Sequence, residues 1–117
     1  MARIVFVDDE ADMLGTLRDA FTELGHEVHT AEDGREGLRL ILDKEPDLAF
    51  VDMRLGGMKG MEILREVKAQ KPGIKTIMLT GYNDSQIDAD AMKHGALMCL
   101  HKPVGLKELA DIIEKYA

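Results

Sequence analysis

The chain has 117 residues, 45% of them hydrophobic and 32% charged, which is typical of a single globular domain. Its 22 acidic and 15 basic side chains give a formal net charge of −7, which disfavours direct binding to nucleic acid or to an anionic membrane surface. No apolar run approaches the roughly 20 residues that cross a bilayer, and a single cysteine, Cys99, cannot form an internal disulfide. These features predict one domain over residues 1–117, cytoplasmic and without a membrane segment.

The first half of the chain predicts two strand–helix units. The apolar run Ile4–Val7 predicts a buried strand, and apolar residues at three- and four-residue steps from Met13 to Leu24 predict a helix that ends before Gly25. A weaker run at Val28–Ala31 predicts the second strand, and the apolar spacing over residues 38–42 predicts the second helix.

A third unit follows in the middle of the chain. The unbroken apolar run Leu48–Val51 predicts a strand buried on both faces, and the spacing from Met61 to Val67 predicts a helix. Pro72 and Gly73 mark the end of this helix, after which the run Ile74–Leu79 predicts the fourth strand.

The last third of the chain predicts the fourth helix, the fifth strand and the fifth helix. The fourth helix, near Asp84–Lys93, has the fewest apolar anchors, while Leu97–Leu100 predicts a buried strand and the spacing from Leu106 to Ile113 a final helix. Five strand–helix units imply parallel strands with right-handed crossovers. The predicted fold is therefore a three-layer α/β/α sandwich around a five-stranded parallel sheet.

Polar side chains stand at the carboxyl ends of four of the five predicted strands. Asp8 and Asp9 follow the first strand, Asp52 the third, Thr80 the fourth and Lys102 the fifth. In open parallel sheets, ligands bind beyond the carboxyl ends of the strands, where the strand order reverses. If the first and third strands are neighbours, three carboxylates converge there with a lysine and a hydroxyl.

Such a crevice is suited to phosphoryl transfer. Three carboxylates and one lysine carry a formal charge of −3 + 1 = −2, which one divalent cation neutralises. Oxygen ligands suit Mg²⁺, which keeps several of its waters and also accepts phosphate oxygens. A carboxylate can then act as the nucleophile, while the metal and Lys102 stabilise the charge of the transferred group.

Each of these residues also has an ordinary structural explanation. The acidic run Asp8–Glu10 suits the start of a helix, Asp52 and Thr80 suit turns, and Lys102 suits an exposed loop. These explanations do not account for the common position of all of them at one end of one sheet, so the joint functional interpretation is favoured.

Several segments together resemble the receiver domains of bacterial two-component response regulators. They are Ile4–Glu10, Leu48–Asp52, Gly57–Glu62, Met78–Gly81 and Leu100–Pro103. Each segment is a weak signal by itself, whereas the ordered set is specific and extends over essentially the whole chain. The resemblance implies a flavodoxin-like receiver fold with the sheet order 2-1-3-4-5.

The resemblance also implies a site chemistry. Asp52 would accept a phosphoryl group from a phosphohistidine of a sensor histidine kinase or phosphotransfer protein. The implied Mg²⁺ ligands are Asp8, Asp9, Asp52 and the backbone carbonyl of Arg54. Thr80 and Lys102 would contact phosphoryl oxygens, and the Lys102–Pro103 peptide resembles one that the family holds in cis.

A signalling role follows from the same resemblance. A receiver domain is not a turnover enzyme, although it catalyses its own phosphorylation and dephosphorylation. Phosphorylation would shift the face formed by the fourth strand, fourth helix, fifth strand and fifth helix, and would thereby control an output. A homodimer formed on phosphorylation is one such output.

The chain departs from the usual receiver pattern at two positions. Gly56 stands where proline is common, and Cys99 replaces the Tyr or Phe that usually reports phosphorylation. The segment Gly81–Asp84 and the helix behind it are therefore expected to carry the response. The bulky side chains of Arg54 and Tyr82 are expected to overhang the phosphoryl group and to slow its hydrolysis.

Three other functions remain open from the residues alone. A magnesium-dependent phosphatase with an aspartate nucleophile needs a second Asp two residues after the first, where this chain has Arg54. A flavin mononucleotide binder needs a Ser/Thr-Gly-rich phosphate loop and aromatic rings, whereas only 4% of these residues are aromatic. A receiver-like scaffold that ignores phosphate usually lacks one of the acidic or lysine positions, and all of them are present here.

Overall fold

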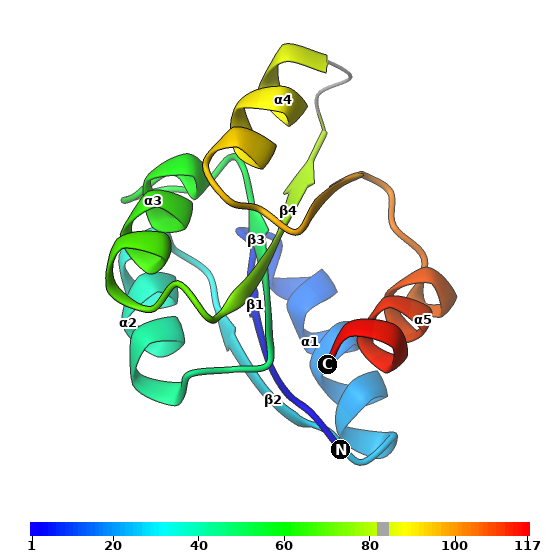
Figure 1. The fold of residues 1–117 in the computed structure, drawn as a ribbon. Coiled ribbons are helices and arrows are strands. Elements are labelled where there is room, and N and C mark those ends of the chain that lie inside the picture. Colours follow the sequence, from blue (N-terminus) through cyan, green and yellow to red (C-terminus); the bar gives the residue numbers. More distant parts are fainter. Residues whose placement is uncertain (82–84) are drawn as a thin grey trace.

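The computed structural model describes residues 1–81 and 85–117, which form a three-layer α/β/α sandwich (Figure 1). The strands are β1 (Arg3–Val7), β2 (Glu27–Ala31), β3 (Leu48–Asp52), β4 (Lys75–Thr80) and β5 (Met98–His101). The helices are α1 (Ala11–Glu23), α2 (Gly34–Lys44), α3 (Gly60–Gln70), α4 (Ser85–Lys93) and α5 (Leu106–Tyr116). Each predicted strand and helix is confirmed, with boundaries that differ by a few residues.

The sheet is parallel throughout, with the order β2-β1-β3-β4-β5, and this confirms the predicted fold class. The strand order reverses between β1 and β3, which are neighbours although β2 lies between them in the sequence. In their register, Val7 lies beside Val51, so the residues that follow each of them emerge together at the carboxyl edge. Thr80 of β4 lies beside His101 of β5 at the same edge.

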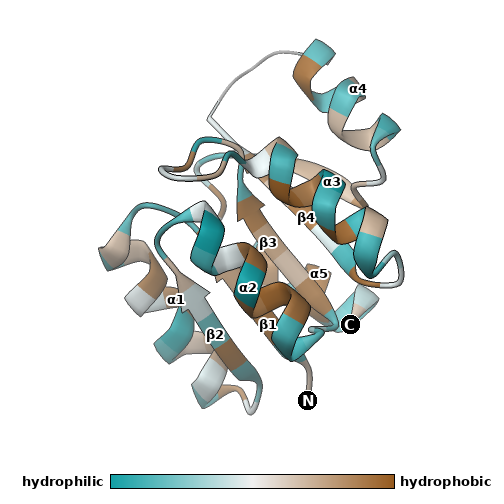
Figure 2. Cartoon of the chain, turned by 90° about the vertical axis from the view of Figure 1, so that its left-hand side faces the viewer, coloured by the Kyte–Doolittle hydropathy of each residue, from teal (hydrophilic) through white to brown (hydrophobic). Residues whose placement is uncertain are grey.

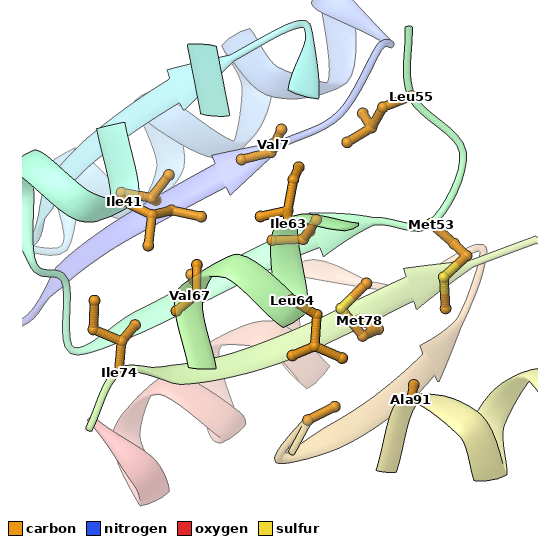
Figure 3. Packing of buried hydrophobic residues seen from close by; sticks show 14 of the residues in the cluster. Val7, Ile41, Met53, Leu55, Ile63, Leu64, Val67, Ile74, Met78 and Ala91 are labelled. Carbon is orange, nitrogen blue, oxygen red and sulfur yellow. The ribbon is translucent and has the colours of Figure 1, made fainter. Parts of the chain in front are cut away.

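Alternate residues of the strands pack on opposite faces of the sheet. Val5 and Val7 of β1 belong to the core cluster under α2, α3 and α4, whereas Ile4 and Phe6 belong to the cluster under α1 and α5. Figure 2 shows α2 and α3 together over the apolar strands, and Figure 3 shows their side chains meeting those of the sheet. This two-sided burial explains why β1 and β3 are unbroken apolar runs.

The edge strand β5 differs from the prediction. Its apolar run indicated a buried strand, but Met98, Cys99 and Leu100 are only half-buried and His101 is exposed. The reason is its place at the edge of the sheet, because β5 has a neighbouring strand on one side only. Burial still raises the pKa of the Cys99 thiol, with a further contribution from the charge of Asp88.

Gly60 fixes the loop that follows β3. A Cβ atom at this position would collide with the backbone carbonyl oxygen of Asp52, and the Gly60 N–H donates to the carbonyl of Met53 over 3.2 Å. Only glycine permits this close approach, which holds the start of α3 against the end of β3. Among the described residues, no helix combines the length and apolar character that crossing a membrane requires.

The side-chain hydroxyl of Thr76 in β4 is expected to lower the free energy of unfolding. Its side chain is fully buried, and within the described part of the chain its hydroxyl has no hydrogen-bond partner. Thr76→Val keeps the shape and removes the unpaired hydroxyl, so we expect the free energy of unfolding to rise by about 1–2 kcal/mol in urea denaturation. The control Thr30→Val, on half-buried β2, should change it by less than about 0.5 kcal/mol. A destabilised Thr76→Val would contradict the assignment of an unpaired hydroxyl.

Candidate functional site

The structure brings the predicted site residues together at the carboxyl edge of the sheet. Asp8 follows β1, Asp52 ends β3, Thr80 ends β4 and Lys102 follows β5. A cavity of ≈ 250 Å³ opens at this edge and is lined by Asp9, Glu10, Asp52, Arg54, Gly81 and Lys102. The position of these groups follows from the parallel register, because neighbouring parallel strands end at the same side of a sheet.

Lys102 is the centre of the site. Its Nζ lies 2.8 Å from Oδ2 of Asp8, 3.1 Å from Oδ2 of Asp52 and 3.3 Å from Oε1 of Glu10. Asp8 is 0% and Asp52 4% exposed, so the lysine pairs with two buried carboxylates. Its backbone N–H donates to the carbonyl of Thr80 over 2.8 Å, and the Lys102–Pro103 peptide is cis, as the resemblance implied.

The second oxygen of each buried carboxylate is held by the backbone. Oδ1 of Asp8 accepts from the N–H of Glu10 over 3.0 Å, and Oδ1 of Asp52 accepts from the N–H of Arg54 over 3.2 Å. Both contacts span two residues, the usual pattern of an aspartate that orders the turn after it. In each carboxylate, the backbone therefore holds Oδ1, while Oδ2 contacts Lys102.

Burial and the neighbouring charges perturb the ionisation of the site. Burial raises the pKa of the Asp8 carboxyl, the negative charge of Asp52 raises it further, and the contacts with Lys102 and the Glu10 N–H oppose this shift. Burial alone would lower the pKa of the Lys102 ammonium, but its contacts with Asp8 and Asp52 outweigh this effect and raise it. Lys102 is therefore firmly protonated.

The oxygen atoms of the site fit a hard divalent cation. One carboxylate oxygen from each of Asp8, Asp9 and Glu10 lies within 4.8 Å of the others. Among the described residues, Oδ2 of Asp8 is buried and accepts no well-directed hydrogen bond, although it is ion-paired with Lys102. An oxygen-only set with spare acceptor capacity and excess negative charge suits Mg²⁺.

Glu10 is the residue that the sequence reasoning did not include in the site. The acidic run indicates a helix start, and Glu10 does occupy the N-cap position of α1, but its side chain makes no cap hydrogen bond. The carboxylate instead extends to Lys102. The available signal was the third acidic residue in the run Asp8–Glu10, which a helix cap does not require.

Of the remaining predicted residues, the structure describes two and leaves two outside its described ranges. Thr80 is fully buried at the end of β4, and Arg54 lines the cavity from the loop after β3. Tyr82, expected to overhang the site, and Asp84, expected at the start of α4, lie outside the described residues. The overhang proposed for Arg54 and Tyr82 together therefore stays a prediction.

Comparisons with known sequences show which family this chain resembles over most of its length. The family model of the response regulator receiver domain matches residues 4–114. Sporulation initiation phosphotransferase F of Bacillus subtilis is 31% identical over 114 residues, 97% of this chain and 92% of that protein. Regulatory protein AtoC of Escherichia coli is 34% identical over 113 residues, but the chain spans only 24% of its length.

Solved structures show the same fold. A receiver domain protein from Clostridium thermocellum superposes with a TM-score of 0.90 at 36% identity, over 99% of this chain and 94% of that one. A CheY-like receiver domain protein from Methanospirillum hungatei gives 0.92 at 32% identity, over 98% and 92%. With the family match over nearly the whole chain, these likenesses identify this protein as a member of the response regulator receiver domain family of two-component systems.

Proposed function

We propose that residues 1–117 form one phosphoacceptor domain in which Asp52 receives a phosphoryl group from a phosphohistidine. The observation that carries this proposal is the pairing of Lys102 with two buried carboxylates, Asp8 and Asp52, beside an open cavity. A buried carboxylate next to a fixed cation and a cavity is placed to react with an anionic group that enters from solvent. Asp8, Asp9, Asp52 and the backbone carbonyl of Arg54 would hold Mg²⁺, which would neutralise the charge that builds up on the phosphoryl oxygens.

The reaction is a single displacement at phosphorus. The Asp52 carboxylate attacks as the bond between phosphorus and the donor imidazole breaks, and the bonding electron pair returns to the imidazole nitrogen. The products are an acyl phosphate on Asp52 and a neutral histidine that keeps the proton on its other nitrogen. Lys102 then pairs with a phosphoryl oxygen, and the Thr80 hydroxyl donates to another, so that both stabilise the transferred group.

This chemistry makes the domain a signalling component, not a turnover enzyme. The partner is a sensor histidine kinase or a phosphotransfer protein in the cytoplasm, and neither nucleic acid nor a membrane binds this domain directly. The alternative, a magnesium-dependent phosphatase with an aspartate nucleophile, needs an acid where Arg54 stands, and a guanidinium does not donate a proton at neutral pH.

Labelling by a small phosphoryl donor tests the proposal. Acetyl phosphate with magnesium should add one base-labile phosphoryl group, measured by intact-protein mass spectrometry. Excess chelator should abolish the mass increase, because the anionic donor must then approach four carboxylates that one lysine only partly neutralises. Unchanged labelling in chelator would contradict the metal requirement, and rapid multiple turnover of phosphate monoesters would favour the phosphatase.

We also propose that phosphorylation acts through the face formed by β4, α4, β5 and α5. The α4 helix has one buried residue, Ala91, and Asp88 holds it to β5 through a contact of 2.8 Å between its Oδ2 and Nε2 of His101. An element with so few buried contacts lies near the low-stability end of a domain and responds to small changes in contact energy. Homodimerisation through this face is one form that the output takes.

Hydrogen exchange measures this response. Beryllofluoride, which mimics a phosphoryl group, should change amide exchange most between Gly81 and His94, because the Thr80 side chain is drawn toward the new acceptor oxygens. The amides of α2 serve as the internal control, since this helix packs on β1 and β2. Changes centred on α1 or α2 would contradict the proposed route.

A further inference from the structure

The Glu10 side chain has no role in capping its own helix. Glu10 stands at the N-cap of α1, where a side chain usually accepts from the first turn, yet its carboxylate makes no such bond. Its side chain is 62% exposed and reaches instead to Lys102, with 3.3 Å between Oε1 and Nζ. This contact joins the start of α1 to the loop after β5.

Lys102 and a metal ion would compete for the same oxygens. The ammonium pairs with Oδ2 of Asp8 and Oδ2 of Asp52, and both of these carboxylates belong to the magnesium site of the proposed function. Two cations that share ligands repel each other, so Lys102 must give up part of its contact with these oxygens when the ion enters. Glu10 supplies a third carboxylate, which Lys102 does not share with the metal. This carboxylate makes the displacement of the ammonium less costly.

The surroundings leave room for such a displacement. Glu10 and Lys102 line the polar cavity of ≈ 250 Å³, and the same two residues line a second, largely apolar cavity of ≈ 420 Å³ between α1 and α5. The Glu10–Lys102 pair therefore lies between the two cavities and lines both of them. Open cavity space thus adjoins both members of this pair.

We propose that Glu10 is a positioning residue for Lys102: it holds the ammonium at the rim of the site, so that Asp8 and Asp52 are free to accept Mg²⁺. This role rests on the proposed function, because it concerns the loading of the same site. Glu10 acts through Lys102, the residue that its carboxylate contacts. Without its carboxylate, Lys102 remains on the two buried aspartates and competes more strongly with the metal.

Calorimetric titration of the unphosphorylated protein with MgCl₂ tests this role without any phosphoryl donor. Glu10→Gln should weaken Mg²⁺ binding by about tenfold, the effect expected for a lost charge contact at the edge of a solvated site. The control Glu23→Gln makes the same change of net charge at the other end of α1, about 20 Å away, where the charge is screened and Mg²⁺ binding should not change. Equal affinities of Glu10→Gln and Glu23→Gln would overturn the role of Glu10.

A double-mutant cycle separates action through Lys102 from a direct effect on the ion. In a Lys102→Met background, Glu10→Gln should weaken Mg²⁺ binding by less than about threefold, because the group that Glu10 positions is gone. A tenfold loss that persists in this background would overturn the positioning role and make Glu10 a ligand or a long-range charge. Lys102→Gln serves as a second background for the same comparison. Circular dichroism in MgCl₂ verifies that each Lys102 variant is folded. A wild-type protein that does not bind Mg²⁺ would overturn the magnesium site of the proposed function as well.

Discussion

Asp52→Asn is expected to abolish phosphorylation by acetyl phosphate or by a phosphorylated kinase. The amide has the shape of the carboxylate and can still accept the Arg54 N–H with its oxygen, but it is not a nucleophile toward phosphorus. The variant also removes one negative charge from a crowded site, so it should fold at least as stably as the wild type in chelator. Intact-protein mass spectrometry measures the labelling, and thermal denaturation measures the stability.

The matched control for this variant is Asp43→Asn, which makes the same change of charge on the exposed surface of α2. It should be labelled as fast as the wild type. Labelling of Asp52→Asn at the wild-type rate would place the phosphoryl group elsewhere, and peptide mapping would then distinguish Asp8 from Asp9. The denaturation curve of Asp52→Asn shows whether the variant is folded, and so excludes unfolding as the cause of a loss of labelling.

Lys102→Met is expected to destabilise the protein in chelator by about 3 kcal/mol, since it leaves the buried carboxylates Asp8 and Asp52 without their cation. This figure allows for the partial exposure of the Lys102 side chain, which is 20%. Saturating Mg²⁺ should restore most of the loss, because the ion replaces the missing positive charge. Urea denaturation with and without Mg²⁺ measures both effects.

The pH dependence of this variant has a definite sign. The pKa of the Asp8 carboxyl is already raised by burial, and the loss of Lys102 removes a contact that lowers it. The folded form then binds more protons than the unfolded form, so the free energy of unfolding falls as pH rises from the ordinary Asp value, near 4, through the raised value. Lys107→Met, on an exposed part of α5, should change stability by less than about 1 kcal/mol at any of these pH values. A Lys102→Met protein as stable as the wild type in chelator would mean that Asp8 and Asp52 do not depend on this lysine.

The fold was predictable from the sequence because it depends on periodicity. Buried parallel strands must be apolar on both faces, and amphipathic helices must place apolar residues three and four positions apart, so both patterns are visible in one dimension. The alternation of the two implied a parallel sheet and, with it, one edge at which Asp8, Asp52, Thr80 and Lys102 all lie. The sheet order itself came from the resemblance to receiver domains, since periodicity does not tell which strands are neighbours.

Pairwise contacts were decided only by the tertiary structure. The half-buried state of Cys99 follows from the edge position of β5, which an apolar run does not reveal. The contact between Glu10 and Lys102 joins residues 92 positions apart, and a local pattern favoured a helix cap for Glu10 instead. The sequence determines which side chains lie at the carboxyl edge, because the apolar pattern shows where each strand ends and the residues that follow it emerge there. Which carboxylate pairs with which cation depends on distances of a few ångströms across separate elements, and only packing sets these distances.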